Sequence, residues 1–107
     1  MNRKIYISGP ISGLPYEQAQ EAFTKAENAI RSKYGALVDV VNPIRLAPRI
    51  TTWNNAMRAC LSAMMECDTI AMLPGWENSE GARLEHTIAM KLGFAVCNEH
   101  YDIISHE

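Results

Sequence analysis

The sequence predicts a doubly wound α/β domain, with a mainly parallel sheet of four to five strands and helices on both faces. Short apolar runs alternate along the whole chain with longer segments whose apolar residues recur every three or four positions. The apolar runs show little polar alternation, which is typical of strands buried on both faces of a parallel sheet. We therefore expect right-handed crossover connections through helices on both sides of one sheet.

The first strand is predicted at residues 4–8, followed by a turn-rich loop from Gly9 to Gly13. A helix opened by Pro15 is predicted over residues 16–33, because apolar residues recur there at helical spacing. Its predicted buried stripe consists of Ala19, Ala22, Phe23, Ala26, Ala29 and Ile30. The charged residues predicted to lie off that stripe are Glu17, Glu21, Lys25 and Glu27.

A second strand is predicted at residues 36–41, after Gly35 ends the helix and before Asn42 and the following proline break the pattern. Residues 44–52 are predicted to form a loop. A second helix is predicted at residues 53–66, with one apolar face. That face consists of Trp53, Met57, Cys60, Leu61 and Met64.

The third strand is predicted at residues 69–73, and a helical pattern resumes at residue 80 and closes at Gly93. Residues 94–97 give a fourth strand. Strand and helix therefore alternate throughout, which predicts a single Rossmann-like or flavodoxin-like domain over residues 1–107.

One carboxylate, Glu85, falls on the small, apolar face of the last helix. The residues three, four or seven positions from it are Gly81, Ala82, Ile88, Ala89 and Leu92. A carboxylate that leaves water needs a donor, a cation or a proton. Glu85 is therefore the first candidate functional residue, and a structural acid or helix-surface ion pair is the alternative. The loops before this helix and after the first strand both belong at the carboxyl ends of strands, where ligands bind in such sheets.

The composition excludes several classes of protein. Apolar residues make up 48% of the 107 residues, charged residues 21%, and the formal net charge is −2 with scattered basic residues. Because the sequence has no basic stripe, we expect no nucleic acid polymer as partner. Because it has no apolar stretch of about 20 residues and no signal peptide, we expect no membrane partner and a cytoplasmic location. Cys60, Cys67 and Cys97 are predicted to be reduced core thiols, and no metal or cofactor motif is present.

Residues 6–10 read Tyr-Ile-Ser-Gly-Pro, residues 67–71 read Cys-Asp-Thr-Ile-Ala, and residues 81–85 read Gly-Ala-Arg-Leu-Glu. In this order the three segments resemble motifs of the nucleoside 2-deoxyribosyltransferase family and of its relatives, the 2′-deoxynucleoside 5′-monophosphate N-glycosidases. Ala89 and Gly93 continue the match, and the resemblance extends from residue 5 to about residue 96.

The resemblance implies cleavage or transfer at the N-glycosidic bond of a (deoxy)nucleoside or its 5′-monophosphate. Glu85 would be the nucleophile, and Tyr6 would help to hold its carboxylate. A carboxylate can attack the anomeric carbon through an oxocarbenium-like transition state, giving a covalent intermediate that water or another base resolves. The expected substrate-binding residues are Ser8, Gly9, Pro10, Ile11, Ser12, Gly13, Asn42, Ser79 and Gly81.

Ser79 provides information on the substrate, and Cys60 on the acid that the reaction needs. At the position of Ser79 the N-glycosidases resemble this chain, whereas the transferases usually carry an aspartate. A serine at a helix N-terminus suits a phosphate, so we expect a 5′-phosphorylated ligand, with a plain helix cap as the alternative. Cys60 stands where family members commonly carry an acid/base aspartate. Either another group protonates the leaving base, or the reaction is slow, or the site only binds.

Other residues are candidates for protonating the leaving base and for contacting the ligand. Those considered as a replacement acid are Asn54, Asn55, Arg58 and Asp68. Arg45 and Arg49, in the loop after Asn42, are candidates for contacting a phosphate or a base, and solvated loop arginines are the alternative.

Three other functions remain open. Phosphoribohydrolases resembling the cytokinin-activating family share a related motif, but Trp76 and the two residues after it stand where their second glycine is expected. A nucleotide-binding or sequestering module without turnover is the second alternative, and a small interaction protein is the third. The family resemblance also implies a homodimer or higher homo-oligomer, because a chain this short leaves a shallow pocket.

Overall fold

The computed structural model describes residues 2–46 and 52–104 and confirms the predicted fold class. Five strands form one sheet in the order β2-β1-β3-β4-β5. The strands are β1 (Arg3–Ser8), β2 (Val38–Val41), β3 (Thr69–Met72), β4 (Ala95–Cys97) and β5 (Ile103–Ile104). The pairs β1–β2, β1–β3 and β3–β4 are parallel, and β5 runs antiparallel to β4.

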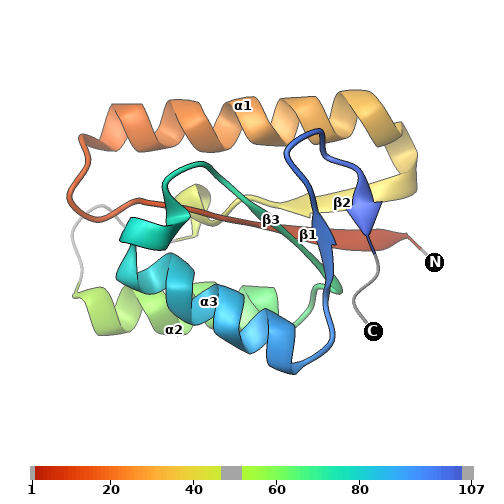
Figure 1. Cartoon of the computed structure of the whole chain (residues 1–107). Helices are drawn as coiled ribbons and strands as arrows, with labels where there is room; N and C mark the ends of the chain where they lie inside the picture. Colours follow the sequence, from red (N-terminus) through yellow and green to blue (C-terminus); the bar gives the residue numbers. More distant parts are fainter. Residues whose placement is uncertain (1, 47–51, 105–107) are drawn as a thin grey trace.

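The helices cover both faces of this sheet, as the sequence predicts. They are α1 (Tyr16–Tyr34), α2 (Trp53–Met64) and α3 (Glu80–Lys91), and 3₁₀ turns occur at Gly35–Leu37, Pro43–Arg45 and Trp76–Asn78. Figure 1 shows α1 alone on one face and α2 and α3 side by side on the other. None of the helices within residues 2–46 and 52–104 combines the length and the apolar character needed to cross a bilayer.

β1 lies at the point where the strand order reverses. The chain passes through α1 to reach β2 on one side of β1, and through α2 to reach β3 on the other side. The carboxyl ends of β1 and β3 therefore flank the crevice in which doubly wound sheets bind ligands. The loops that leave these two ends are residues 9–15 and 73–79.

The alternation of side chains along β1 divides the core into two layers. Ile5 and Ile7 pack with Phe23 of α1, whereas Tyr6 packs with Cys60 of α2 on the other face. Because side chains two positions apart in a strand point to the same face, Ser8 follows Tyr6 toward α2 and α3. The alternation along β1 thus directs the hydroxyl groups of Tyr6 and Ser8 toward α3.

Several predicted boundaries differ from the structure. Residues 36–37 belong to a 3₁₀ turn rather than to the second strand, and α2 ends two residues before the predicted end at residue 66. Of the predicted loop 44–52, residues 44–45 lie in a 3₁₀ turn and residues 47–51 lie outside the described residues. Ala22, predicted to be buried, is exposed.

The short β5 at the C-terminal end was not predicted as a separate strand. Asn98 organises the turn before it, because its Oδ1 atom accepts hydrogen bonds from the backbone N–H groups of His100 and Asp102 at 2.9 Å. The Asp102 carboxylate also pairs with the Lys33 ammonium group. The Tyr34 hydroxyl donates to the Tyr101 carbonyl at 2.6 Å. These contacts attach the β4–β5 hairpin to the end of α1.

Candidate active site

Glu85 is buried in the middle of α3, with 5% of the residue exposed. The helix begins at Ser79, whose Oγ atom accepts a hydrogen bond from the Ala82 N–H at 3.3 Å. Gly81, Ala82 and Ala89 present little side-chain bulk on the same face, so α3 can approach the sheet closely. The predicted inward orientation of Glu85 is therefore confirmed.

Two hydroxyl groups of β1 hold the Glu85 carboxylate. The Tyr6 hydroxyl donates to Oε2 at 2.6 Å, and the Ser8 hydroxyl donates to Oε1 at 2.7 Å. Tyr6 and Ser8 are completely buried. Each carboxylate oxygen thus has one short, charge-assisted hydrogen bond, and the plane of the group is fixed.

The environment of Glu85 disfavours its charge. Burial raises the pKa of the Glu85 carboxyl above its usual range, and the hydrogen bonds from Tyr6 and Ser8 oppose this rise. Burial, followed by the nearby Glu85 charge, raises the pKa of the Tyr6 phenol far above its usual value. Tyr6 therefore remains a neutral hydrogen-bond donor to the carboxylate.

Cys60 of α2 lies beside this pair and is buried. Burial raises the pKa of the Cys60 thiol, a hydrogen bond with Tyr6 lowers it, and the Glu85 charge raises it further. The net rise keeps the sulfur protonated near neutral pH. The position where the family resemblance implies an acid therefore carries a neutral thiol in contact with Tyr6.

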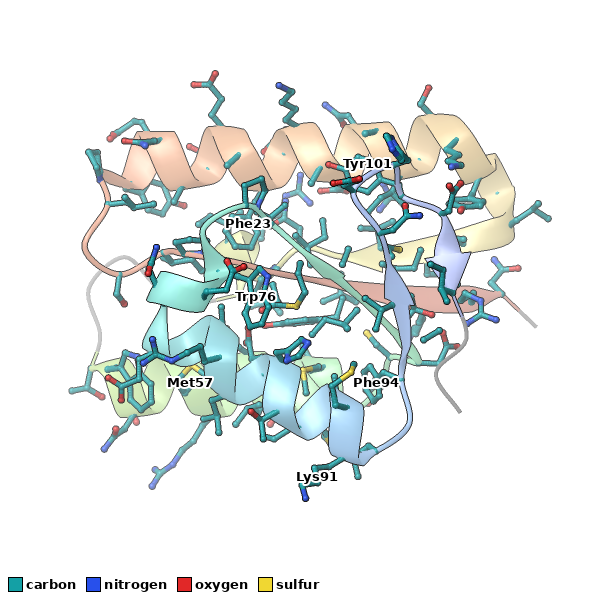
Figure 2. The ribbon with its side chains drawn as sticks, in the orientation of Figure 1. Phe23, Met57, Trp76, Lys91, Phe94 and Tyr101 are labelled. Atoms are coloured by element: carbon teal, nitrogen blue, oxygen red, sulfur yellow. The ribbon has the colours of Figure 1, made fainter. Side chains whose placement is uncertain are left out.

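Glu85 opens into a small pocket at the carboxyl end of β1, with a cavity volume of about 70 Å³. Its walls come from the loop after β1, from both helix layers and from the start of α3. Figure 2 shows Phe23 pointing down from α1 and Met57 on the α2 side of the sheet. The residues that line the pocket are Tyr6, Gly9, Ile11, Ser12, Phe23, Pro43, Trp53, Ala56, Met57, Cys60, Ser79, Gly81, Ala82 and Glu85.

The structure brings most of the predicted site residues together. Those that line the pocket are Tyr6, Gly9, Ile11, Ser12, Ser79, Gly81 and Glu85, and Ser8 bonds to Glu85 behind them. Pro10 and Gly13 do not line it. Gly13 has a φ of +85° and no atom within 4 Å of an added Cβ, so it serves the turn rather than the pocket.

Gly9 allows the loops after β1 and β3 to pack together. A Cβ atom added at Gly9 would lie 2.7 Å from Cβ of Leu73, a residue of the second loop. Real Cβ atoms do not approach so closely, so only glycine fits here without a backbone shift. The two loops are therefore in direct contact at this end of the sheet.

Asn42, a predicted substrate-binding residue, is not among the residues that line the pocket. It is buried, its Nδ2 atom donates to Oε1 of Glu27 at 3.1 Å, and its Oδ1 atom accepts from the Ile44 N–H at 3.1 Å. Both ends of the amide are therefore used within the fold. Pro43, the next residue, lines the pocket instead.

Glu27, predicted to lie off the buried stripe of α1, is in fact buried. Arg31 Nε donates to its Oε2 at 2.9 Å, and Arg45 Nη1 donates to its Oε1 at 2.7 Å. Burial alone would raise the pKa of Glu27, but the hydrogen bonds from Asn42, Arg31 and Arg45 outweigh it and lower the pKa. Arg45 thus joins α1 to the loop after β2. Arg49 lies outside the described residues.

The residues considered as a replacement acid do not line the pocket. Asp68 lies at the amino end of β3, where its Oδ1 atom accepts from the Thr69 hydroxyl at 2.7 Å. Asn54, Asn55 and Arg58 are exposed on α2. Within residues 2–46 and 52–104, the ionisable side chains that line the pocket are Tyr6, Cys60 and Glu85.

The sequence interpretation missed the apolar wall of the pocket, which consists of Phe23, Pro43, Trp53, Ala56 and Met57. The sequence places Trp53 and Met57 only on the apolar face of the second predicted helix. The signal that could have identified them is their spacing with Cys60, because residues 53, 57 and 60 lie on one helix face beside the predicted acid position. Trp53 is 39% exposed, which is high for a core tryptophan.

The comparison with curated proteins found no match, and the comparison with solved structures found none either. The comparison with protein families found a match over residues 3–98. This range includes every strand from β1 to β4, all three helices and the whole candidate site. The chain therefore belongs to the family described as a domain of unknown function, DUF4406.

Proposed function

We propose that this chain cleaves or transfers the N-glycosidic bond of a (deoxy)nucleoside or its 5′-monophosphate, with Glu85 as the nucleophile. The observation that carries the proposal is a buried carboxylate, held by Tyr6 and Ser8, that faces a pocket at the switch point of the sheet. The resemblance of residues 6–10 and 81–85 to the nucleoside 2-deoxyribosyltransferase motifs supports the same assignment.

The contacts of Glu85 suit nucleophilic attack at an anomeric carbon. One short bond to each oxygen fixes the orientation of the carboxylate and favours its charged form. The low polarity of the surroundings strengthens attraction between this charge and the positive charge that develops on the sugar in the transition state. Attack from Oε1 or Oε2 would give a glycosyl ester, which water or an acceptor base then resolves.

The pocket walls suit the two ends of a nucleotide. Trp53, which is 39% exposed, and the apolar residues beside it in the pocket would contact a flat base. Ser12 and the start of α3 at Ser79 provide polar groups and the positive end of a helix dipole for a 5′-phosphate. The hydroxyl of Ser79 caps α3 and still lines the pocket, so the capping role and the binding role are compatible.

A second chain would complete the site. Pockets for drug-sized ligands enclose roughly 300–1,000 Å³, whereas this cavity measures about 70 Å³. One chain would therefore enclose the reacting sugar carbon and leave much of the base or phosphate uncovered. We propose that a homodimer or higher homo-oligomer supplies the rest of the pocket.

The second candidate function is a nucleotide-binding module on the same pocket without turnover. The observation that favours it is the neutral Cys60 thiol at the position where the resemblance implies an acid. A binder of this kind would be stabilised by its ligand according to the ligand concentration and the dissociation constant, without consuming it.

Incubation of the purified protein with nucleosides and 5′-monophosphates, followed by chromatography of the free base, tests both functions. The matched variants are Glu85→Gln and Glu80→Gln, because Glu80 lies on the same helix but is exposed to solvent. The enzyme proposal expects base release by the wild type and by Glu80→Gln, and its loss in Glu85→Gln. A thermal shift without base release would support the binding module. The absence of both a thermal shift and base release would contradict both functions.

A further inference from the structure

The negative charge of Glu85 has no positive partner in the part of the chain that the structure describes. Its hydrogen bonds come from two neutral hydroxyl groups, and it takes part in no ion pair there. No lysine or arginine is among the described residues that line the pocket. Buried charges are normally paired, so this site favours a ligand that itself brings a positive charge.

The described pocket also has no group that is suited to protonate a leaving base. The Tyr6 proton is committed to Oε2 of Glu85, and the Cys60 thiol is a weak acid whose pKa burial raises further. Glu85 itself is the proposed nucleophile.

The missing acid matters for some bases and not for others. When a neutral base leaves, it takes the electron pair of the C1′–N bond and becomes an anion unless it is protonated. General acid catalysis of such a step contributes typically about 10²- to 10⁴-fold. A base with a quaternised ring nitrogen leaves as a neutral molecule, because the electron pair of the broken bond cancels its positive charge.

We propose that the preferred substrates of this site are nucleosides or 5′-monophosphates whose base carries a fixed positive charge in its ring. This inference rests on the proposed function. In the first step a Glu85 oxygen forms an ester bond to C1′, the C1′–N bond breaks, and the neutral base departs. In the second step water attacks C1′, the carboxylate leaves, and one proton passes to solvent.

The walls of the pocket agree with a cationic base. Two aromatic residues, Phe23 and Trp53, are among those that line the pocket, and Trp53 is 39% exposed. The face of an aromatic ring, and that of tryptophan above all, attracts a cation that lies within about 6 Å of it. The half-exposed Trp53, beside a carboxylate that has no cationic partner among the described residues, would thus stabilise positive charge on the base and on the sugar.

A pair of substrates that differ by one methyl group and one charge tests the proposal. The pair is 7-methylguanosine 5′-monophosphate and guanosine 5′-monophosphate, each also in its 2′-deoxy form, with base release measured against an incubation without protein. We expect the wild type to cleave the methylated member at least about 100-fold faster, which is the lower end of the usual contribution of a general acid. We also expect the ratio of the two rates to narrow as the pH falls, since the proton for the unmethylated base must come from solvent, whereas protonation of Glu85 slows both reactions alike.

Two variants at position 60 provide a matched comparison. Cys60→Asp places a carboxylic acid beside Tyr6, so we expect it to narrow the preference about 10-fold or more by gaining rate on the unmethylated substrate. Cys60→Ser adds no acid and should not narrow it. If Cys60→Asp does not fold, the wild-type ratio of the rates on the methylated and unmethylated substrates still tests the proposal.

The outcomes separate this inference from the proposed function. Similar cleavage of both substrates, lost in Glu85→Gln, would overturn the preference for a charged base and leave the glycosidic function intact. No cleavage of either substrate, together with none of any other nucleotide, would overturn both.

Discussion

Tyr6 of β1 and Glu85 of α3, 79 positions apart in the chain, share a 2.6 Å hydrogen bond in which the phenol donates to the carboxylate. The bond joins β1, at the switch point of the sheet, to the helix that follows β3. Because each partner is buried, the geometry of the pair depends on the packing of α3 against β1.

Replacement of Tyr6 by phenylalanine should slow the proposed reaction by roughly 10- to 100-fold, since a hydrogen bond to a charged group contributes about 1.5–3 kcal/mol. In the wild type the hydrogen bond from Tyr6 lowers the pKa of Glu85. Without it that pKa should rise, so the acidic limb of the pH–rate profile should move to higher pH in the variant. Tyr34→Phe is the control, because it removes a 2.6 Å hydrogen bond far from the pocket. Unchanged pH profiles in both variants would contradict this role of Tyr6.

Replacement of Glu85 by glutamine should leave the protein equally stable or raise its free energy of unfolding at pH 8 by about 0.5–2 kcal/mol. Burial raises the pKa of Glu85, so the folded state binds its proton more tightly than the unfolded state. Its stabilising contribution is therefore present below the unfolded pKa of about 4.3 and is lost as the pH rises through the folded pKa. Urea unfolding of both proteins between pH 4 and pH 8 measures the difference in their free energies of unfolding. A variant that is less stable than the wild type at pH 8 would contradict the prediction.

Replacement of Glu27 by glutamine should have the opposite pH dependence. The pKa of Glu27 is lowered in the folded state, so its stabilisation is present above the unfolded pKa and is lost as the pH falls through the folded pKa. We expect a loss of about 1–2 kcal/mol at pH 7, at the low end for a charged hydrogen bond because Arg31 and Arg45 are half exposed. The loss should disappear near pH 3. Equal losses at both pH values, measured by urea unfolding, would argue against this assignment.

Replacement of Gly9 by alanine should destabilise the protein by about 1–3 kcal/mol, since the new Cβ would lie 2.7 Å from Cβ of Leu73 and one of the two loops must shift. Gly81→Ala is the comparison, because its Cβ would meet the flexible side chain of Met57 at 3.0 Å and should cost less. Thermal unfolding measures the order of the two variants. The reverse order would mean that the contact at Gly9 does not constrain the two loops.

The fold and the centre of the site were predictable because both depend on short-range patterns. The strand at 4–8 was evident from its apolar run, and the alternation along it directs Tyr6 and Ser8 to one face. The small residues around Glu85 at helical spacing predicted its inward orientation. The structure confirms that orientation with 5% exposure of Glu85.

The residues that the sequence interpretation misplaced depend on contacts between distant segments. Glu27 lies four residues after Phe23 and three before Ile30, on the buried side of α1, but its charge made it look exposed. Asn42 and Arg45 from the end of β2 bond to it there. The same contacts remove Asn42 from the pocket. β5 has only two residues, and the turn made by Asn98 and the pairing of Asp102 with Lys33 determine its place. No local periodicity reports such contacts.

The most direct test of the central claim is intact-protein mass spectrometry of the wild type, quenched in acid during turnover of a cleaved nucleotide, followed by peptide mapping. The proposed mechanism predicts an added mass equal to the sugar and its phosphate without the base, located on the peptide that contains Glu85 and absent from Glu85→Gln. Base release with no adduct, or with an adduct on another residue, would contradict the assignment of Glu85 as the nucleophile.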